Sequence, residues 1–203
     1  MSARNSERGT SEPGAPKQDL VALAGAARLF GDLLLHEVTV ESLRAMQEPG
    51  PLALLASVGV VVPDASDPSQ EFLDELASEY HAALLAPTGG GAPPVASLWI
   101  EGRFEGQIVS RLRVLATSAA LEFGSEAARG APVDHLGVLL HLWAASTERA
   151  PWVADEIAAE HLAWTHAPLQ QMQGRGGFYG GVAVAAAELV QVIKSTVATP
   201  VTP

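Results

Sequence analysis

The sequence contains no cysteine, and aromatic residues make up only 5% of its 203 residues. Without cysteine, the chain can form no disulfide, no thiolate metal site and no cysteine nucleophile. The shortage of aromatic residues, combined with abundant Ala and Leu, favours helices over strands. Because a chain of this length usually folds around one core, we predict one domain of the all-α class, a helical bundle.

Long apolar runs are also missing. No stretch of about 18 uninterrupted apolar residues is present. Residues 1–17 are polar, contain Pro and Gly, and have no apolar signal core, which predicts a disordered tail. We therefore expect a cytoplasmic protein without stable membrane insertion, with a folded domain at 18–197 and a flexible end at 198–203.

Positive charge is scarce: 12 Lys and Arg stand against 23 Asp and Glu, giving a formal net charge of -11. Phosphate contacts need clustered basic residues, and here they are scattered, so we expect no nucleic-acid partner. A basic peptide would complement this charge better. Excess carboxylate that keeps an Ala-rich protein soluble accounts for the charge equally well.

Apolar spacing predicts a series of helices. The first begins at Asp19 as its N-cap. Its apolar residues at helical spacing are Leu20, Leu23, Ala27, Phe30 and Leu34. Further helices are predicted at 40–47 with Thr39 as cap, and at 51–59, 105–123, 132–148, 151–165 and 177–195, with a short helical stretch at 167–172.

The helix that begins at Asp67-Pro68 leads into an unusual segment. It carries Phe72, Leu76, Tyr80 and Leu84 at a spacing of four, and it ends before Pro87. Residues 86–103 are too rich in Gly and Pro for a helix. They nevertheless contain Val95, Leu98, Trp99 and Ile100. A long loop with apolar content is either packed against the core or used for binding.

Catalytic and metal-binding patterns are hard to find. No serine has the neighbours of a Gly-x-Ser-x-Gly nucleophile. The glycines at 88–91 and 174–181 lack the Lys-Ser/Thr pair of a phosphate loop, so we interpret them as turns. Glu156 and Glu160 share a helix face beside His161, but no second Glu-x-x-His set accompanies them. We interpret that group as a solvated acidic face, and we predict no metal, no cofactor and no catalytic residue.

Residues 131–135, Ala-Pro-Val-Asp-His, form a more suggestive group at the head of an apolar helix. Pro132 suits the entry to a helix, and Asp134 in the first turn would face the positive end of the helix dipole. His135 beside it can donate or accept a hydrogen bond near neutral pH. A charged first turn with a half-buried histidine explains the same residues without a function.

Three segments, in this order, resemble the TorD/DmsD family of redox-enzyme maturation proteins. The first runs from Tyr80 through a Gly-Pro loop to Pro-Pro-Val-Ala-Ser-Leu-Trp, ending at Trp99. The second, Pro-Val-Asp-His at 132–135, is similar to the family's Glu-Pro-x-Asp-His signature. The third is His-Leu-Ala-Trp at 161–164 with the helix that follows. Ala131 and Val95 depart from the family's usual carboxylate and tryptophan.

This resemblance implies a helical chaperone that binds the twin-arginine signal peptide and immature form of a molybdenum-cofactor oxidoreductase, and assists cofactor insertion before export. Carried over by motif, the candidate peptide site is Tyr80, Leu84, Pro94, Ser97, Trp99, Pro132, Asp134 and His135. Asp134 would face a client arginine, while Tyr80, Leu84 and Trp99 would line the apolar part.

Two other functions remain open. The nearer is a chaperone of the nitrate-reductase delta-subunit type, which holds a client that is not exported. The more distant is a helical small-ligand-binding protein or enzyme, which stoichiometric bound metal, pterin or nucleotide after dialysis would reveal. Both a monomer and a dimer are compatible with the sequence.

Overall fold

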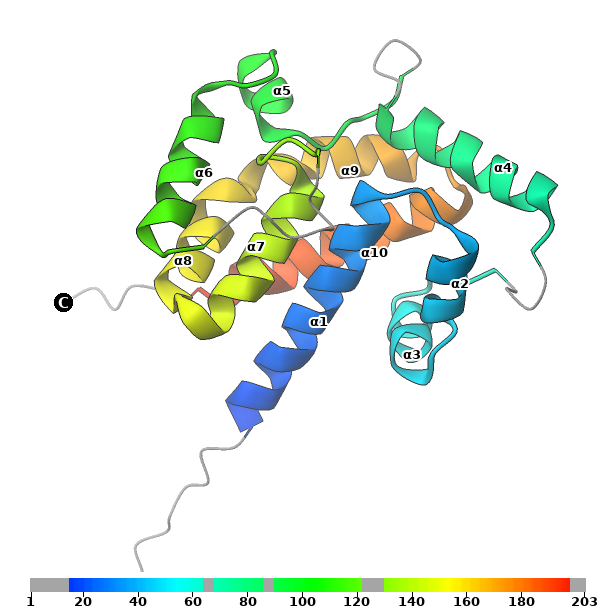
Figure 1. Cartoon of the computed structure of the whole chain (residues 1–203), viewed down its shortest axis with the longest axis horizontal. Helices are drawn as coiled ribbons and strands as arrows, with labels where there is room; N and C mark the ends of the chain where they lie inside the picture. Colours follow the sequence, from blue (N-terminus) through cyan, green and yellow to red (C-terminus); the bar gives the residue numbers. More distant parts are fainter. Residues whose placement is uncertain (1–14, 64–67, 86–89, 122–129, 198–203) are drawn as a thin grey trace, which may run out of the picture.

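The computed structural model describes residues 15–63, 68–85, 90–121 and 130–197, and these residues form a helical bundle (Figure 1). The α-helices are α1 (Ala15–Leu35), α2 (Val40–Met46), α3 (Pro49–Ser57), α4 (Gln70–Tyr80), α5 (Ala96–Glu101), α6 (Gln107–Ser118), α7 (Leu136–Arg149), α8 (Pro151–Glu156), α9 (His166–Gln173) and α10 (Gly177–Ser195). Within the described ranges, the one β-type pairing is an isolated bridge between Val95 and His135. The all-α prediction is confirmed.

Three long helices, α1, α7 and α10, form the centre of the bundle (Figure 1). α1 and α7 run antiparallel, and their backbones touch where Gly31 meets Gly137. A Cβ atom on Gly137 would lie 2.6 Å from Cγ of Leu35 and 2.7 Å from the carbonyl oxygen of Gly31. Only glycine allows this approach, which brings the end of α1 against the start of α7.

Shorter helices cover the two ends of this centre. α6 and α8 lie at one end, and α2, α3 and α4 lie at the other (Figure 1). α10 is long and apolar enough to cross a membrane by length and composition alone. In this fold, however, Tyr179, Val182, Ala186 and Val190 of α10 are buried in the core. Its hydropathy is therefore explained by packing.

The predicted starts of α1 and α4 change in the structure, and the helix predicted from 132 begins at Leu136 as α7. α1 begins at Ala15, so Asp19 lies inside the helix and does not cap it. The first turn of a helix tolerates a proline such as Pro16, because the N–H that proline lacks would have no partner within the helix there. The cap of α4 is Ser69, whose hydroxyl accepts a hydrogen bond from the Phe72 N–H at 3.2 Å. The predicted start at Asp67, the rest of the predicted tail at 1–14 and the predicted flexible end at 198–203 lie outside the described residues.

Other predicted starts and faces agree with the structure. Thr39 caps α2 through a reciprocal pair of hydrogen bonds with Ser42. On α1, Ala27, Phe30 and Leu34 are buried, as their spacing predicts. α10 spans the residues predicted for the last helix.

The prediction of a loop over 86–103 is wrong for its second half. Residues 96–101 form α5, which ends at Gly102 in the left-handed conformation (φ 70°). All the prolines of this segment, and all its glycines except Gly102, precede the helix. The group that caps the start of the helix comes from a distant part of the chain. The local composition therefore does not predict α5.

Two π-helical turns interrupt the regular helices. One, η1 (His81–Leu85), extends α4, and the other, η4 (Ile157–His161), extends α8. The helix predicted over 151–165 is thus a chain of α8, η4 and a 3-10 turn, η5 (Ala163–Thr165). π turns are rare in proteins, but those that occur are often found at functional sites.

Candidate functional site

Two segments far apart in sequence, 93–99 and 132–137, are tied together at the starts of α5 and α7. The Ala96 N–H donates to the Asp134 carbonyl at 3.0 Å, and the Leu136 N–H donates to the Pro94 carbonyl at 2.7 Å. Between these bonds lies the bridge from Val95 to His135. We call this pair of segments the α5–α7 clamp. It brings two of the three family-like motifs into direct contact.

Asp134 is fully buried within the clamp, at 0% exposure. Its Oδ2 accepts a hydrogen bond of 2.7 Å from the Ser97 N–H, in the first turn of α5. The expected position of Asp134 in the first turn of α7 is therefore wrong: it precedes that helix, and it caps α5 instead. A carboxylate there satisfies a free N–H group and faces the positive end of the α5 dipole. Its Oδ1 has no hydrogen-bond partner among the described residues.

His135 is the N-cap of α7, and its ring is buried. Its Nδ1 accepts a hydrogen bond from the Gly137 N–H at 3.1 Å. Burial, with a smaller contribution from His36, lowers the pKa of His135 from 6.5 to about 4. The imidazole is therefore neutral at pH 7 and carries its proton on Nε2, because Nδ1 is used as an acceptor.

The other candidates in these segments also take part in the clamp. The Trp99 indole N–H donates to the Pro93 carbonyl at 2.7 Å, and its ring is half-buried. The Ser97 hydroxyl is buried and has no described partner. Pro132 is exposed, and its carbonyl accepts from the His135 N–H at 2.9 Å, which closes the turn before α7.

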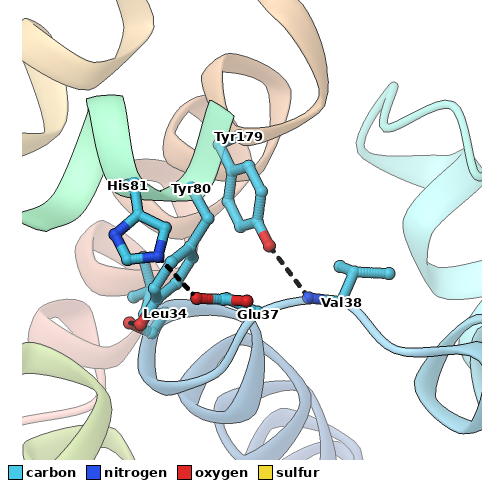
Figure 2. Close-up of polar contacts among 6 residues, drawn as sticks. All are labelled: Leu34, Glu37, Val38, Tyr80, His81 and Tyr179. Carbon is cyan, nitrogen blue, oxygen red and sulfur yellow. Dashed lines mark hydrogen bonds and ion pairs between the residues drawn. The ribbon is translucent and has the colours of Figure 1, made fainter. Parts of the chain in front are cut away.

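Tyr80 and Leu84 lie in a second place, on α4 and η1, and both are buried. Figure 2 shows Tyr80 packed beside Tyr179 at the end of α1, with ring centroids 5.3 Å apart. The Tyr80 hydroxyl donates a long hydrogen bond of 3.4 Å to the Leu34 carbonyl. Burial and the charge of Glu37 raise the pKa of Tyr80 to about 12, so it stays protonated. These residues fix α4 against α1.

No hydrogen bond in the described part of the chain joins the side chains of Tyr80 or Leu84 to the clamp. The two places are linked through the backbone, because the Ala92 N–H donates to the Ala83 carbonyl at 2.8 Å. The structure thus brings six candidates together, and it places the remaining two in the neighbouring core.

Sequence patterns did not predict several polar residues of this core. The Tyr179 hydroxyl accepts from the Val38 N–H at 3.2 Å (Figure 2), and the Tyr179 N–H donates to Glu79 Oε1 at 2.6 Å. His81 pairs with Glu37 at 2.8 Å on the surface. Nothing in the spacing along the chain pointed to these pairs, because their members are far apart in sequence.

A recess of about 390 Å³ opens beside the clamp. Its lining residues are Phe104, Glu105, Val109, Arg113, Gly130, Ala131, Pro132, Val133 and Asp134. Phe104 is 53% exposed although it is a large apolar side chain. Glu105 has a φ of 57°, which is uncommon for a residue with a Cβ atom. The recess therefore combines an exposed aromatic ring, both signs of charge and a buried carboxylate.

This arrangement is suited to binding more than to catalysis. Asp134 and His135 are both engaged with backbone N–H groups, and neither is placed to activate the other. In the described ranges, no group of three His, Asp or Glu side chains could hold a metal ion. The site combines a shaped recess with two buried side-chain oxygens that have no partner among the described residues, Asp134 Oδ1 and the Ser97 hydroxyl.

Comparison with known proteins gives the family. The family model described as the nitrate reductase delta subunit matches residues 45–173, more than half of the chain. The chain belongs to this family. All eight candidate residues lie inside the matched range.

A solved structure has a similar fold. It is the crystal structure of a proposed redox enzyme maturation protein from Archaeoglobus fulgidus, with a TM-score of 0.54 and 16% sequence identity. The similarity covers 91% of this chain and 99% of the other. Together with the nitrate reductase delta subunit family match, it confirms the resemblance to the TorD/DmsD maturation proteins. No curated protein matches the sequence significantly.

Proposed function

We propose that this protein is a non-enzymatic assembly chaperone of the cytoplasm, which binds the twin-arginine signal peptide of a molybdenum-cofactor oxidoreductase until the cofactor is inserted. Family membership and the redox-maturation description of the similar structure support the general role. The acidity of the chain suits a basic peptide. The finer role rests on the recess beside the α5–α7 clamp.

One observation carries this proposal: Asp134 lines the recess, and its buried Oδ1 has no hydrogen-bond partner among the described residues. A buried carboxylate oxygen without a donor costs free energy, and it needs an explanation in a native protein. A donor that the client brings, either an arginine side chain or a peptide N–H, would satisfy it. Phe104 at the rim would then pack against apolar residues of the same peptide.

A conservative substitution separates this role from the structural one. In Asp134→Asn, the side-chain oxygen still accepts from the Ser97 N–H, while the amide NH₂ replaces Oδ1, the oxygen without a partner among the described residues. We expect the affinity for a synthetic peptide, two adjacent arginines followed by about ten apolar residues, to fall about tenfold in calorimetry.

The matched control is Asp19→Asn, an exposed aspartate on α1, and it should bind like the wild type. Circular dichroism and the melting temperature verify that both variants are folded. If Asp134→Asn binds within twofold of the wild type, the recess is not the peptide site.

A second function is favoured by the description of the family itself, the nitrate reductase delta subunit. A chaperone of that kind would use the same recess to hold the mature N-terminal segment of a client that stays in the cytoplasm. The two functions differ in the peptide that binds, and peptides of both kinds can be compared directly.

A further inference from the structure

A second groove lies between α6 and the α8–η4 segment, away from the clamp residues. It has a volume of about 620 Å³, larger than the recess. Trp152 and Val114 line it and are 49% and 69% exposed. Large apolar side chains left open beside a concave surface are typical of a binding site.

Two carboxylates, Glu156 and Glu160, also line this groove. Both are exposed, and neither forms an ion pair with a residue in the described part of the chain. Arg111 is the basic residue on the facing helix. The groove is therefore net negative, with apolar side chains beside the negative charge.

The π turn η4 places His161 in the same groove. Residues five positions apart in a regular α-helix, such as Glu156 and His161, would point about 140° apart. The wider π turn at Ile157–His161 changes this register, and both residues line the groove. The π turn thus brings two polar side chains into one groove, as is common for π turns at functional sites.

His161 is 7% exposed, and its Nδ1 has no hydrogen-bond partner among the described residues. Burial lowers the pKa of His161, an effect that Glu156 and Glu160 oppose. The ring is therefore neutral at pH 7, with one nitrogen as donor and the other as acceptor. His161 lines the groove, and a buried nitrogen without a partner is a polar group that a ligand can satisfy.

We infer that the α6–α8 groove binds the arginine side chains of the client peptide. In this arrangement Glu156 and Glu160 receive the guanidinium groups, Trp152 lies against a guanidinium face, and Val114 contacts the apolar residue beside them. The carboxylates can accept paired N–H donors from the planar guanidinium, and its face can stack on the exposed indole. This inference rests on the proposed function and assigns its arginine contacts to a second subsite.

The position of the groove supports one peptide that spans both sites. A shallow apolar depression lined by Arg113, Val114, Thr117 and Ser118 lies along α6. It shares Arg113 with the recess, and it shares Val114 and Ser118 with the groove. An extended segment could therefore cross α6 with its arginines at Glu156 and Glu160 and its apolar part at Phe104.

The test is calorimetry with the same paired-arginine peptide and the full chain. We expect the double variant Glu156→Gln/Glu160→Gln to bind about tenfold more weakly than the wild type, since two charge-assisted contacts are lost. The control is Glu71→Gln/Glu75→Gln, which removes two exposed carboxylates at the same spacing from α4, at the other end of the bundle. It should bind within twofold of the wild type.

A second peptide, with both arginines replaced by glutamine, should show little difference between the wild type and the groove variant. If Asp134→Asn weakens peptide binding and the groove variant does not, this inference is overturned and the proposed function stays in place. The reverse pattern would support the groove and overturn the role of the recess. If the wild type binds no paired-arginine peptide, both fail.

Discussion

The α5–α7 clamp and the α6–α8 groove each contain a carboxylate followed directly by a histidine, and the two pairs lie in opposite settings. Asp134 and His135 are buried and bonded to backbone N–H groups at the starts of two helices. Glu160 is exposed beside His161, whose buried Nδ1 has no described partner. The pair Asp134-His135 thus stabilises the fold, whereas the pair Glu160-His161 is left for a ligand.

This difference teaches that resemblance to a motif and availability for binding are separate properties. The motif at 132–135 first organises two helices, and only one oxygen of Asp134 is left for a partner. Variants of the clamp should therefore change the free energy of unfolding. Variants of the groove should change binding with little effect on stability.

The largest effect is expected at the start of α7. Gly137→Ala would place a methyl group against Leu35 and the Gly31 backbone, and we expect a loss of about 3 kcal/mol in the free energy of unfolding. Urea denaturation measures it. Gly25→Ala on α1 is the control, because a Cβ atom there meets nothing within 4 Å, and it should stabilise the protein by about 0.5–1 kcal/mol. Equal effects of the two changes would contradict the close contact of α1 with α7.

The next effect concerns the pH dependence of the clamp. The folded-state pKa of His135, about 4, lies below the ordinary value of 6.5. Its neutral form therefore contributes stability that is present above pH 6.5 and is lost as the pH falls toward 4. Between pH 7 and pH 5 we expect a loss of about 2 kcal/mol from this group.

The variant His135→Asn isolates that contribution, because asparagine also caps a helix and does not titrate. Unfolding measured at both pH values should show a smaller decrease for the variant than for the wild type. The buried, neutral state of His135 would be refuted by equal decreases.

The smallest effect is expected in the groove. Glu156→Gln/Glu160→Gln removes exposed charges that pair with no described residue, so the free energy of unfolding should change by less than about 0.5 kcal/mol. Thermal unfolding of the wild type and the variant side by side checks this. A loss of several kcal/mol would show that these carboxylates support the fold, and the contrast with the clamp would disappear.

The fold was predictable to a large extent from periodicity. α10 and the buried face of α1 follow from apolar residues at helical spacing, and Thr39 follows from its capping chemistry. These features depend on neighbours in the sequence. α5 was missed because its N-terminal N–H group bonds to Asp134, a residue that the local sequence does not reveal.

The candidate site was predicted in part. The motifs correctly pointed to residues that meet in space, since 93–99 and 132–137 form the clamp. Their burial could not be predicted, because it depends on how α7 packs between α1 and α8. Glu156, Glu160 and His161 were noticed and interpreted as a solvated face, since the π turn that gathers them with Trp152 has no sequence signature.

The most direct test of the chaperone function uses the client's own sequences. It compares the affinity of this protein for two synthetic peptides from its redox-enzyme client, the twin-arginine leader and the first residues of the mature chain. We predict that the leader binds, that the recess and groove variants both weaken this binding, and that the mature segment shows no measurable binding. Binding of the mature segment alone would contradict this prediction and would favour a chaperone for a client that is not exported.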